Sequence, residues 1–224
     1  MLIVEELHLL LTTADGAQER SGSMRAYGEA AAIVTDLVLA NRVTLSEEKR
    51  PRVQITSDAP IGHPVLDFAL ERLLAKDGAR LDSVITWAKL DPEQPVVASL
   101  VDAGVLAIGE RTFWGLGKAR TPEADPAPEA ALRARLAAVL AGTAPAGVAD
   151  ATLLAILQGL DVAGTILREE AAGRRPRALK ARISEIVGAS PAGSAVERAV
   201  QAMNTAIMTA AIIPAITVTT ITSS

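Results

Sequence analysis

The stretch ATLLAILQGLDVAGTIL, residues 151–167, carries a single charged side chain, that of Asp161. A helix of this composition has almost no polar face to present to water, so we expect it to lie at the centre of the molecule. Around it, several segments repeat apolar residues at spacings of three and four, which is typical of helices with one buried face. The sequence therefore predicts a mainly α fold, a helical bundle in which amphipathic outer helices surround buried core helices.

The other helices are delimited by apolar spacing and by stop signals. Residues 24–40 carry an amphipathic stripe that ends at Asn41, and residues 95–103 end at Gly104; both residue types are common where helices stop. Residues 2–11 fit a helix or an extended segment. The remaining predicted helices cover residues 65–75, with Leu66, Ala69, Leu70, Leu73 and Leu74 on one face, then 81–89, 130–140 and 169–187, and a last helix begins near Ser194.

Two stretches predict short β-hairpins. Residues 42–55 alternate apolar and polar side chains on both sides of the charged turn SEEKRP, which is the pattern of two short strands. Residues 105–117, VLAIGERTFWGLG, place two short apolar runs around the turn at residues 109–111, which is the pattern of a second hairpin.

Phe113, Trp114 and Leu116 lie beside the turn of the second hairpin, which cannot bury three apolar side chains by itself. They either pack on the helices or stay exposed and insert at a lipid interface. Trp is favoured at such an interface, and flanking cations such as Arg111 and Lys118 help.

The composition is that of a folded globular chain, for which we favour one domain spanning residues 1–224. Half of the residues are apolar and 21% are charged, a balance that argues against intrinsic disorder. The chain has no Cys, which excludes thiolate catalysis and disulfides and fits the cytoplasm. Its formal net charge of -4 does not favour phosphate polymers, so no nucleic-acid partner is expected.

Neither end of the chain has the pattern of a membrane-inserted segment. Glu5 and Glu6 stand where a secretory signal peptide would carry Lys or Arg. Residues 199–224 lack charge, but Asn204 and Pro214 are among the residues that interrupt the apolar run. We therefore expect a buried helix there and no transmembrane span.

The sequence predicts no catalytic or metal site. His8 and His63 are the only imidazoles, and neither lies in a known motif, so structural or solvated roles are expected for both. We predict a non-enzymatic protein without cofactor or metal. An enzyme hidden in the helical bundle stays open as an alternative, which a deep pocket lined by acids would favour.

One dense basic cluster has two interpretations. It is either a solvated face partnered with Glu169, Glu170 and Glu185, or a surface that attracts anionic lipid head groups. The cluster consists of Arg168, Arg174, Arg175, Arg177, Lys180 and Arg182.

Several segments, in this order, resemble the Golgi phosphoprotein 3 family. The most specific is SDAPIGHPVLDFAL, residues 57–70, which resembles the family's Ser-Asp-Ala-Pro-x-Gly loop and the Leu-Asp-x-Ala-Leu helix after it. LIVEELHLLL, residues 2–11, and IVTDLVLANRVTL, residues 33–45, resemble its opening segment and its helix into a strand. The resemblance covers essentially the whole chain, and the Ala, Gly, Pro and Arg usage is similar to that of bacterial, especially actinobacterial, members.

The resemblance implies a mostly helical domain with a protruding hydrophobic β-hairpin, attached to the periphery of a membrane. In eukaryotic members the domain binds phosphatidylinositol 4-phosphate and acts as an adaptor that retains glycosyltransferases. The family's hairpin aligns with residues 105–116 here, so Phe113, Trp114 and Leu116 are the expected lipid contacts.

The residues of the family's head-group pocket are not retained. Its Trp and one Arg fall near Ser21 and Ala30, and two further Arg fall among residues 92–95. The candidate head-group contacts are therefore Arg25 and Tyr27, which lie nearby, together with Arg111 and Lys118 in the hairpin. Losing charge-assisted contacts to phosphate removes most specificity, so the lipid is expected to be anionic without a predicted identity.

The leading hypothesis from the sequence is a cytoplasmic peripheral membrane protein that binds anionic lipid or a phosphoinositide through this hairpin and nearby basic residues. The alternative is a protein-interaction adaptor or a self-associating scaffold, a homo-oligomer formed through the same hairpin without lipid specificity.

Overall fold

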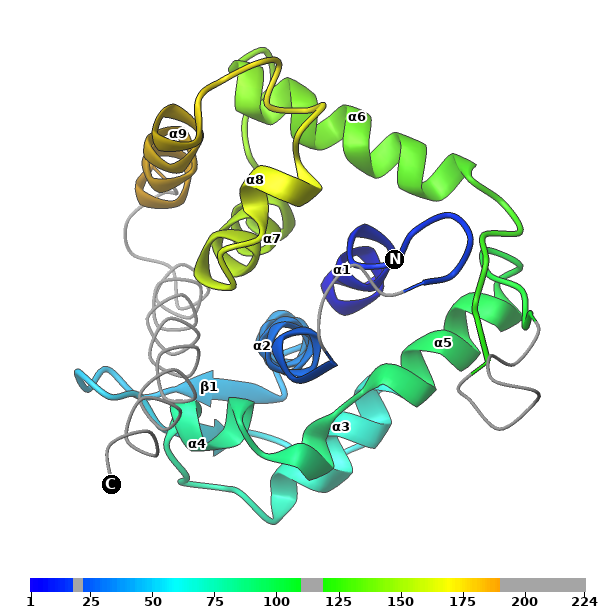
Figure 1. Cartoon of the computed structure of the whole chain (residues 1–224). Helices are drawn as coiled ribbons and strands as arrows, with labels where there is room; N and C mark the ends of the chain where they lie inside the picture. The colour runs from blue at the N-terminus through cyan, green and yellow to red at the C-terminus, as the bar shows by residue number, and fades with distance from the viewer. Residues whose placement is uncertain (18–21, 110–118, 190–224) are drawn as a thin grey trace, which may run out of the picture.

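The computed structural model describes residues 1–17, 22–109 and 119–189. Within these ranges the chain is mostly helical, as predicted, with one two-stranded sheet (Figure 1). The helices are α1 (Ile3–Leu10), α2 (Gly22–Leu39), α3 (Pro64–Leu74), α4 (Leu81–Ile85), η1 (Ala88–Leu90), α5 (Glu93–Asp102), α6 (Ala127–Ala141), α7 (Val148–Gly159), α8 (Ala163–Ile166) and α9 (Pro176–Gly188).

Three helices, α1, α2 and α7, occupy the centre, and the other helices surround them (Figure 1). Every residue of α1 is buried, and α7 exposes little besides Gln158 at its end. The prediction of a central position is confirmed for residues 151–160, but Asp161, Gly164 and Thr165 are exposed, so the rest of the predicted helix reaches the surface. The chain does not run straight through the predicted helix, because Asp161 takes a left-handed conformation with φ 56° and separates α7 from α8.

Helix α2 is buried more completely than the single apolar stripe predicted for residues 24–40. Residues 28–38 are all buried, because α1, α3, α4 and α7 pack around them. Gly28 permits a close approach to the end of α7, since a Cβ there would lie 2.8 Å from Cδ1 of Leu160. The chain therefore has a second core helix that carries buried charges.

The first predicted hairpin is confirmed. Strands β1 (Val43–Leu45) and β2 (Val53–Ile55) pair antiparallel with Val43 opposite Ile55. Helix α3 buries most of the face predicted for it, but Leu74 at its end is exposed and Val65 is buried instead. The helix predicted over residues 81–89 is broken into α4 and η1.

The second hairpin has a stem formed by residues 105–109 and 119–124. The N–H of Ala107 donates to the carbonyl of Pro122, and the N–H of Gly109 donates to the carbonyl of Arg120, both over 2.9 Å. The sequence predicted a turn at residues 109–111 and a returning strand that ends before residue 117. The predicted pairing was wrong, because residues 107 and 109 pair with residues 122 and 120. Residues 110–118, which connect the two halves of the stem, lie outside the described residues.

Among the described residues, no helix is both long and apolar enough to cross a bilayer. The uncharged stretch 199–224 and the helix predicted from Ser194 lie outside them, so those predictions stay untested.

Candidate functional site

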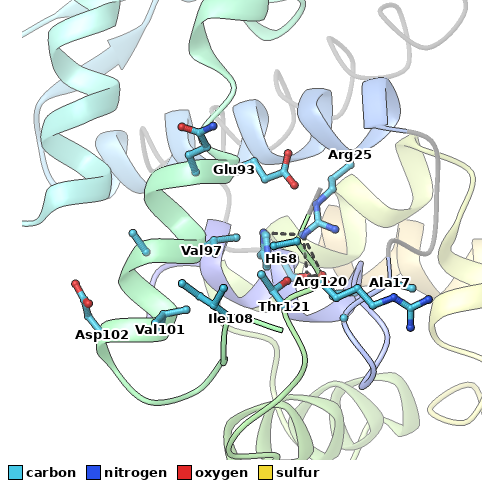
Figure 2. Close-up of a pocket in the computed structure, with 15 residues that line it drawn as sticks. His8, Ala17, Arg25, Glu93, Val97, Val101, Asp102, Ile108, Arg120 and Thr121 are labelled. Atoms are coloured by element: carbon cyan, nitrogen blue, oxygen red, sulfur yellow. Dashed lines mark hydrogen bonds between the residues drawn. The ribbon is translucent and has the colours of Figure 1, made fainter. Parts of the chain in front are cut away.

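A pocket of about 660 Å³ lies between α5, the loop that follows α1, and the stem of the second hairpin (Figure 2). One wall comes from α5, where Val97 and Val101 are one helical turn apart and therefore share a face. Val96 and Leu100, each one position earlier, are buried in the core. Ile108 of the stem faces the same space and is 72% exposed, so an apolar side chain stands at the rim.

The loop after α1 and the stem meet at a very close backbone approach. Gly16 has φ +79°, and a Cβ there would lie 2.5 Å from the backbone nitrogen of Thr121 and 2.6 Å from that of Pro122. Only glycine fits this combination of left-handed backbone and contact. The pocket wall therefore depends on Gly16.

His8 and Arg25 line the buried end, or floor, of the pocket, and Glu29 behind them completes a polar cluster. Arg25 and Glu29 are four residues apart on α2, with Nε of Arg25 2.8 Å from Oε1 of Glu29. His8 of α1 places Nδ1 2.9 Å from the same oxygen. Burial by itself raises the pKa of Glu29, but the hydrogen bonds and charges of His8 and Arg25 outweigh it and hold the pKa below its usual value.

The Arg25 guanidinium is largely engaged within the protein. Besides Glu29, it donates to the carbonyl of Leu11 over 3.3 Å and to the hydroxyl of Thr12 over 3.0 Å, and its Nη2 lies 2.6 Å from Nδ1 of His8. Its positive charge contributes to the pocket, but few N–H groups remain for a ligand.

Charges of both signs lie around the rim. Arg120 of the stem pairs with Asp15 of the loop over 2.7 Å. The hydrogen bond from Thr13, and then the charge of Arg120, lower the pKa of the exposed Asp15 carboxyl. Glu93 and Asp102 of α5 also line the pocket. Its mouth is therefore not a purely cationic surface.

A second pocket, of about 500 Å³, is polar and lies beside α6. Burial, with a contribution from Glu123, raises the pKa of the Glu129 carboxyl to about 7. Arg133 opposes this shift. Arg133 pairs with Glu129 over 2.6 Å and with Glu170 over 2.9 Å. This arrangement fits an internal ion-pair network, although it is the acid-lined kind of pocket that an enzyme would need.

Comparison with models of known protein families identifies the family of this chain. The model of the Golgi phosphoprotein 3 (GPP34) family matches residues 3–203. The chain belongs to this family. No curated protein matches it.

Some positions that the sequence resemblance assigned to a head-group pocket lie among the described residues. Glu93 and Gln94, among the positions that correspond to two family arginines, line the pocket described above. Ala30, near the position of another, is buried in the core, and Ser21 lies outside the described residues. Two of the positions named by the resemblance therefore line this pocket, with Glu and Gln side chains.

Of the predicted head-group contacts, only Arg25 reaches the pocket within the described residues. Tyr27, two residues along α2, packs half-buried against the core and does not line the pocket. The other predicted site residues, Arg111, Phe113, Trp114, Leu116 and Lys118, lie outside the described residues.

The basic cluster is split between two environments. Arg182 pairs with Glu185 over 2.9 Å, which is the pairing that the solvated-face interpretation expected for Glu185. Arg182 also donates to the carbonyls of Val139 and Leu140. Glu170 pairs with Arg133, outside the cluster. Arg175, Arg177 and Lys180 are exposed on and beside α9.

Sequence reasoning named Arg120 only as one of the cations beside the hairpin, and it missed His8 and Ile108 as pocket residues and Glu29 as the buried partner of His8. The available signal was Arg25 and Glu29, which stand one helical turn apart in the first half of an otherwise apolar helix. Such a pair in a core helix needs a polar partner from another element. Among the described residues, no group of three or more acidic or His side chains is placed to hold a metal ion.

Proposed function

We propose that this protein is a peripheral membrane protein that binds anionic lipid at the pocket beside the stem of its second hairpin. The observation that carries the proposal is the position of Ile108, an exposed apolar residue at the rim of a pocket whose floor holds the Arg25 charge. An apolar rim over a polar floor suits a lipid, since the acyl region and the head group need different surroundings.

The sequence between the two halves of the stem also carries apolar residues. Gly109 and Arg120 are hydrogen-bonded across the stem, so the segment between them is anchored at both ends beside the pocket. That segment carries Phe113, Trp114 and Leu116. We propose that these three side chains enter the bilayer interface while the pocket takes a head group.

Basic residues supply the preference for anionic lipid. Arg120 stands at the rim, and Arg111 and Lys118 belong to the adjoining segment. Each cation near an anionic surface contributes about 1 kcal/mol to binding. Because the family's Trp and Arg positions are not retained, we propose binding to anionic phospholipids as a class, phosphatidylinositol 4-phosphate included, at the cytoplasmic face of a membrane.

Co-sedimentation with vesicles tests the proposal. We expect the protein to pellet with vesicles that contain phosphatidylglycerol or phosphatidylinositol 4-phosphate, but not with pure phosphatidylcholine. A Phe113→Ala/Trp114→Ala double variant should remain in the supernatant. The control is Trp87→Phe, which changes an aromatic residue of the folded body that packs against the core.

The proposal is wrong if the wild type stays in the supernatant with both anionic vesicles. If the double variant pellets normally but loses concentration-dependent self-association, the segment is a protein contact, and the adaptor or scaffold alternative is correct.

A further inference from the structure

We propose that His8 is a ligand-binding residue, whose Nε2 donates a hydrogen bond to a phosphoryl oxygen of the head group at the floor of the pocket. The inference rests on the proposed lipid-binding function and names the residue that recognises the ligand. None of the family positions located above coincides with His8 or its partners.

The first observation is an unsatisfied atom. His8 lines the pocket and is 1% exposed, and Nε2 has no hydrogen-bond partner among the described residues. A buried polar group without a partner is costly. A ligand oxygen at the floor of the pocket would remove that cost, which favours a ligand that penetrates to the floor over one that rests on the rim.

The second observation is that the ring is held from its other side. Nδ1 lies 2.9 Å from Oε1 of Glu29 and 2.6 Å from Nη2 of Arg25. Both partners come from α2 and both are buried. The orientation of the ring is therefore fixed by α2, which leaves Nε2 as the ring nitrogen without a partner among the described residues.

The contacts of Nδ1 favour Nε2 as a donor. A guanidinium nitrogen can only donate, so when Nδ1 accepts from Arg25 the proton of the neutral ring is on Nε2. If Nδ1 instead donates to Glu29, Nε2 is a donor only in the doubly protonated ring. The proposal therefore requires Nε2 to carry a proton in the complex, so that it presents N–H to an acidic oxygen.

The remaining surroundings indicate which acidic ligand fits. Apolar side chains, Val97, Val101 and Ile108, form much of the wall above the floor, and they suit the glycerol and first acyl carbons of a lipid. A free phosphate ion would leave this wall without a partner. The same hydrogen bond would nevertheless form to inorganic phosphate, so the experiment includes both.

Matched substitutions separate the two ring nitrogens. The amide of Asn lies near the position of Nδ1, and that of Gln lies near the position of Nε2. We expect His8→Asn to fold and to bind dihexanoyl phosphatidylglycerol about 10- to 100-fold more weakly than the wild type, which corresponds to the loss of one hydrogen bond to a charged group. His8→Gln should retain more affinity than His8→Asn, and His63→Gln, the control, should bind as the wild type does.

Nitrogen-15 NMR of the histidine rings gives a measurement that does not depend on a variant of His8. The chain has two His residues, and the His63→Gln variant assigns the His8 signals. We expect dihexanoyl phosphatidylglycerol to shift the Nε2 signal of His8, with Nε2 protonated in the complex, and inorganic phosphate to shift it only at much higher concentration. Equal responses to both would support the hydrogen bond and assign the site to free phosphate.

The proposal is overturned if saturating lipid leaves the Nε2 signal unchanged, or if His8→Asn binds the short-chain lipid as tightly as the wild type. Failure of the membrane function is a different result. In that case no vesicle binds the wild type, whatever the His8 ring shows with soluble ligands.

Discussion

The carboxylate of Asp36, in the middle of α2, accepts the backbone N–H of Ile3 at the start of α1. Its second oxygen accepts the N–H of Val4, and both distances are 3.0 Å. The first N–H groups of a helix have no partner within the helix, and here a side chain 33 residues away supplies one. The two core helices are thereby joined through a buried charge.

Asp36 should make stability depend on pH. Burial, aided by Glu5 and Glu6 and opposed by the two backbone N–H groups, raises the pKa of Asp36 from 3.8 to about 7. The folded protein then holds this proton more tightly than the unfolded chain does. The stabilisation it contributes is fully present below pH 3.8 and is lost as the pH rises through about 7. Between these two pH values, this group should lower the unfolding free energy by about 1 kcal/mol for each unit that the pH rises.

Urea unfolding between pH 5 and 8 checks this expectation. Asp36→Asn should be less stable than the wild type at pH 5, because the amide replaces one acceptor by a donor, and it should show a weaker pH dependence. Asp58→Asn, at an exposed position, should leave the slope unchanged. A slope that is the same in Asp36→Asn and the wild type would show that Asp36 does not hold the proton.

Arg135 joins three helices, and its loss should destabilise the fold. From α6 it places Nη2 2.7 Å from Oε2 of Glu6 on α1 and Nε 2.6 Å from Oδ1 of Asp150 on α7. The side chains of both acids are at most 10% exposed, so removing the cation leaves two poorly solvated carboxylates. We expect Arg135→Ala to lower the unfolding free energy by about 2 kcal/mol, since the Arg itself is partly screened by water.

Arg135→Lys should recover little of this stability, because an ammonium group cannot reproduce the fork of contacts to two acids. Arg177→Ala, at an exposed position of α9, is the matched control and should have almost no effect. If Arg135→Lys and Arg177→Ala are equally stable in urea, the contacts of Arg135 do not contribute.

Gly16→Ala should disrupt the pocket wall. The substitution adds a Cβ that would lie 2.5 Å from the backbone of Thr121, at φ +79°, so the loop and the stem must move apart. We expect a loss of more than about 2 kcal/mol in unfolding free energy together with weaker lipid binding. Gly78 has a comparable φ of +72° with nothing within 4 Å, so Gly78→Ala should show only the backbone strain of about 1 kcal/mol and should bind lipid normally. Equal losses in the two variants would exclude the steric effect.

The sequence predicted much of the helical bundle because apolar spacing is a local property. Residues 151–160 were correctly placed at the centre, since they carry no charge and leave no polar face. Helix α2 was not, because it carries Arg25, Glu29 and Asp36. These charges are compatible with burial only because they have partners on α1, such as His8. The spacing of apolar residues within one segment does not indicate partners on another helix.

The candidate site was only partly predictable for the same reason. Arg25 was identified as a head-group candidate and does line the pocket, but its engagement by Glu29 and Leu11 depends on the packing of α1 against α2. The returning strand of the hairpin was misplaced because the apolar run at 112–116 looked like a strand partner. The actual pairing, Leu106 opposite Glu123, joins a buried residue to a polar one, which no hydrophobic pattern indicates.

Ile108→Gln tests the membrane orientation without disturbing the core. The side chain is 72% exposed in the folded protein, so its removal should leave the unfolding free energy within about 0.5 kcal/mol of the wild type. If the rim of the pocket faces lipid, the variant loses the transfer of one large apolar side chain out of water, and vesicle affinity should fall about tenfold. Leu74→Gln replaces another exposed apolar residue, 47% exposed at the end of α3, and should bind vesicles as the wild type does. Equal affinities of the two variants would mean that the pocket rim does not contact the bilayer.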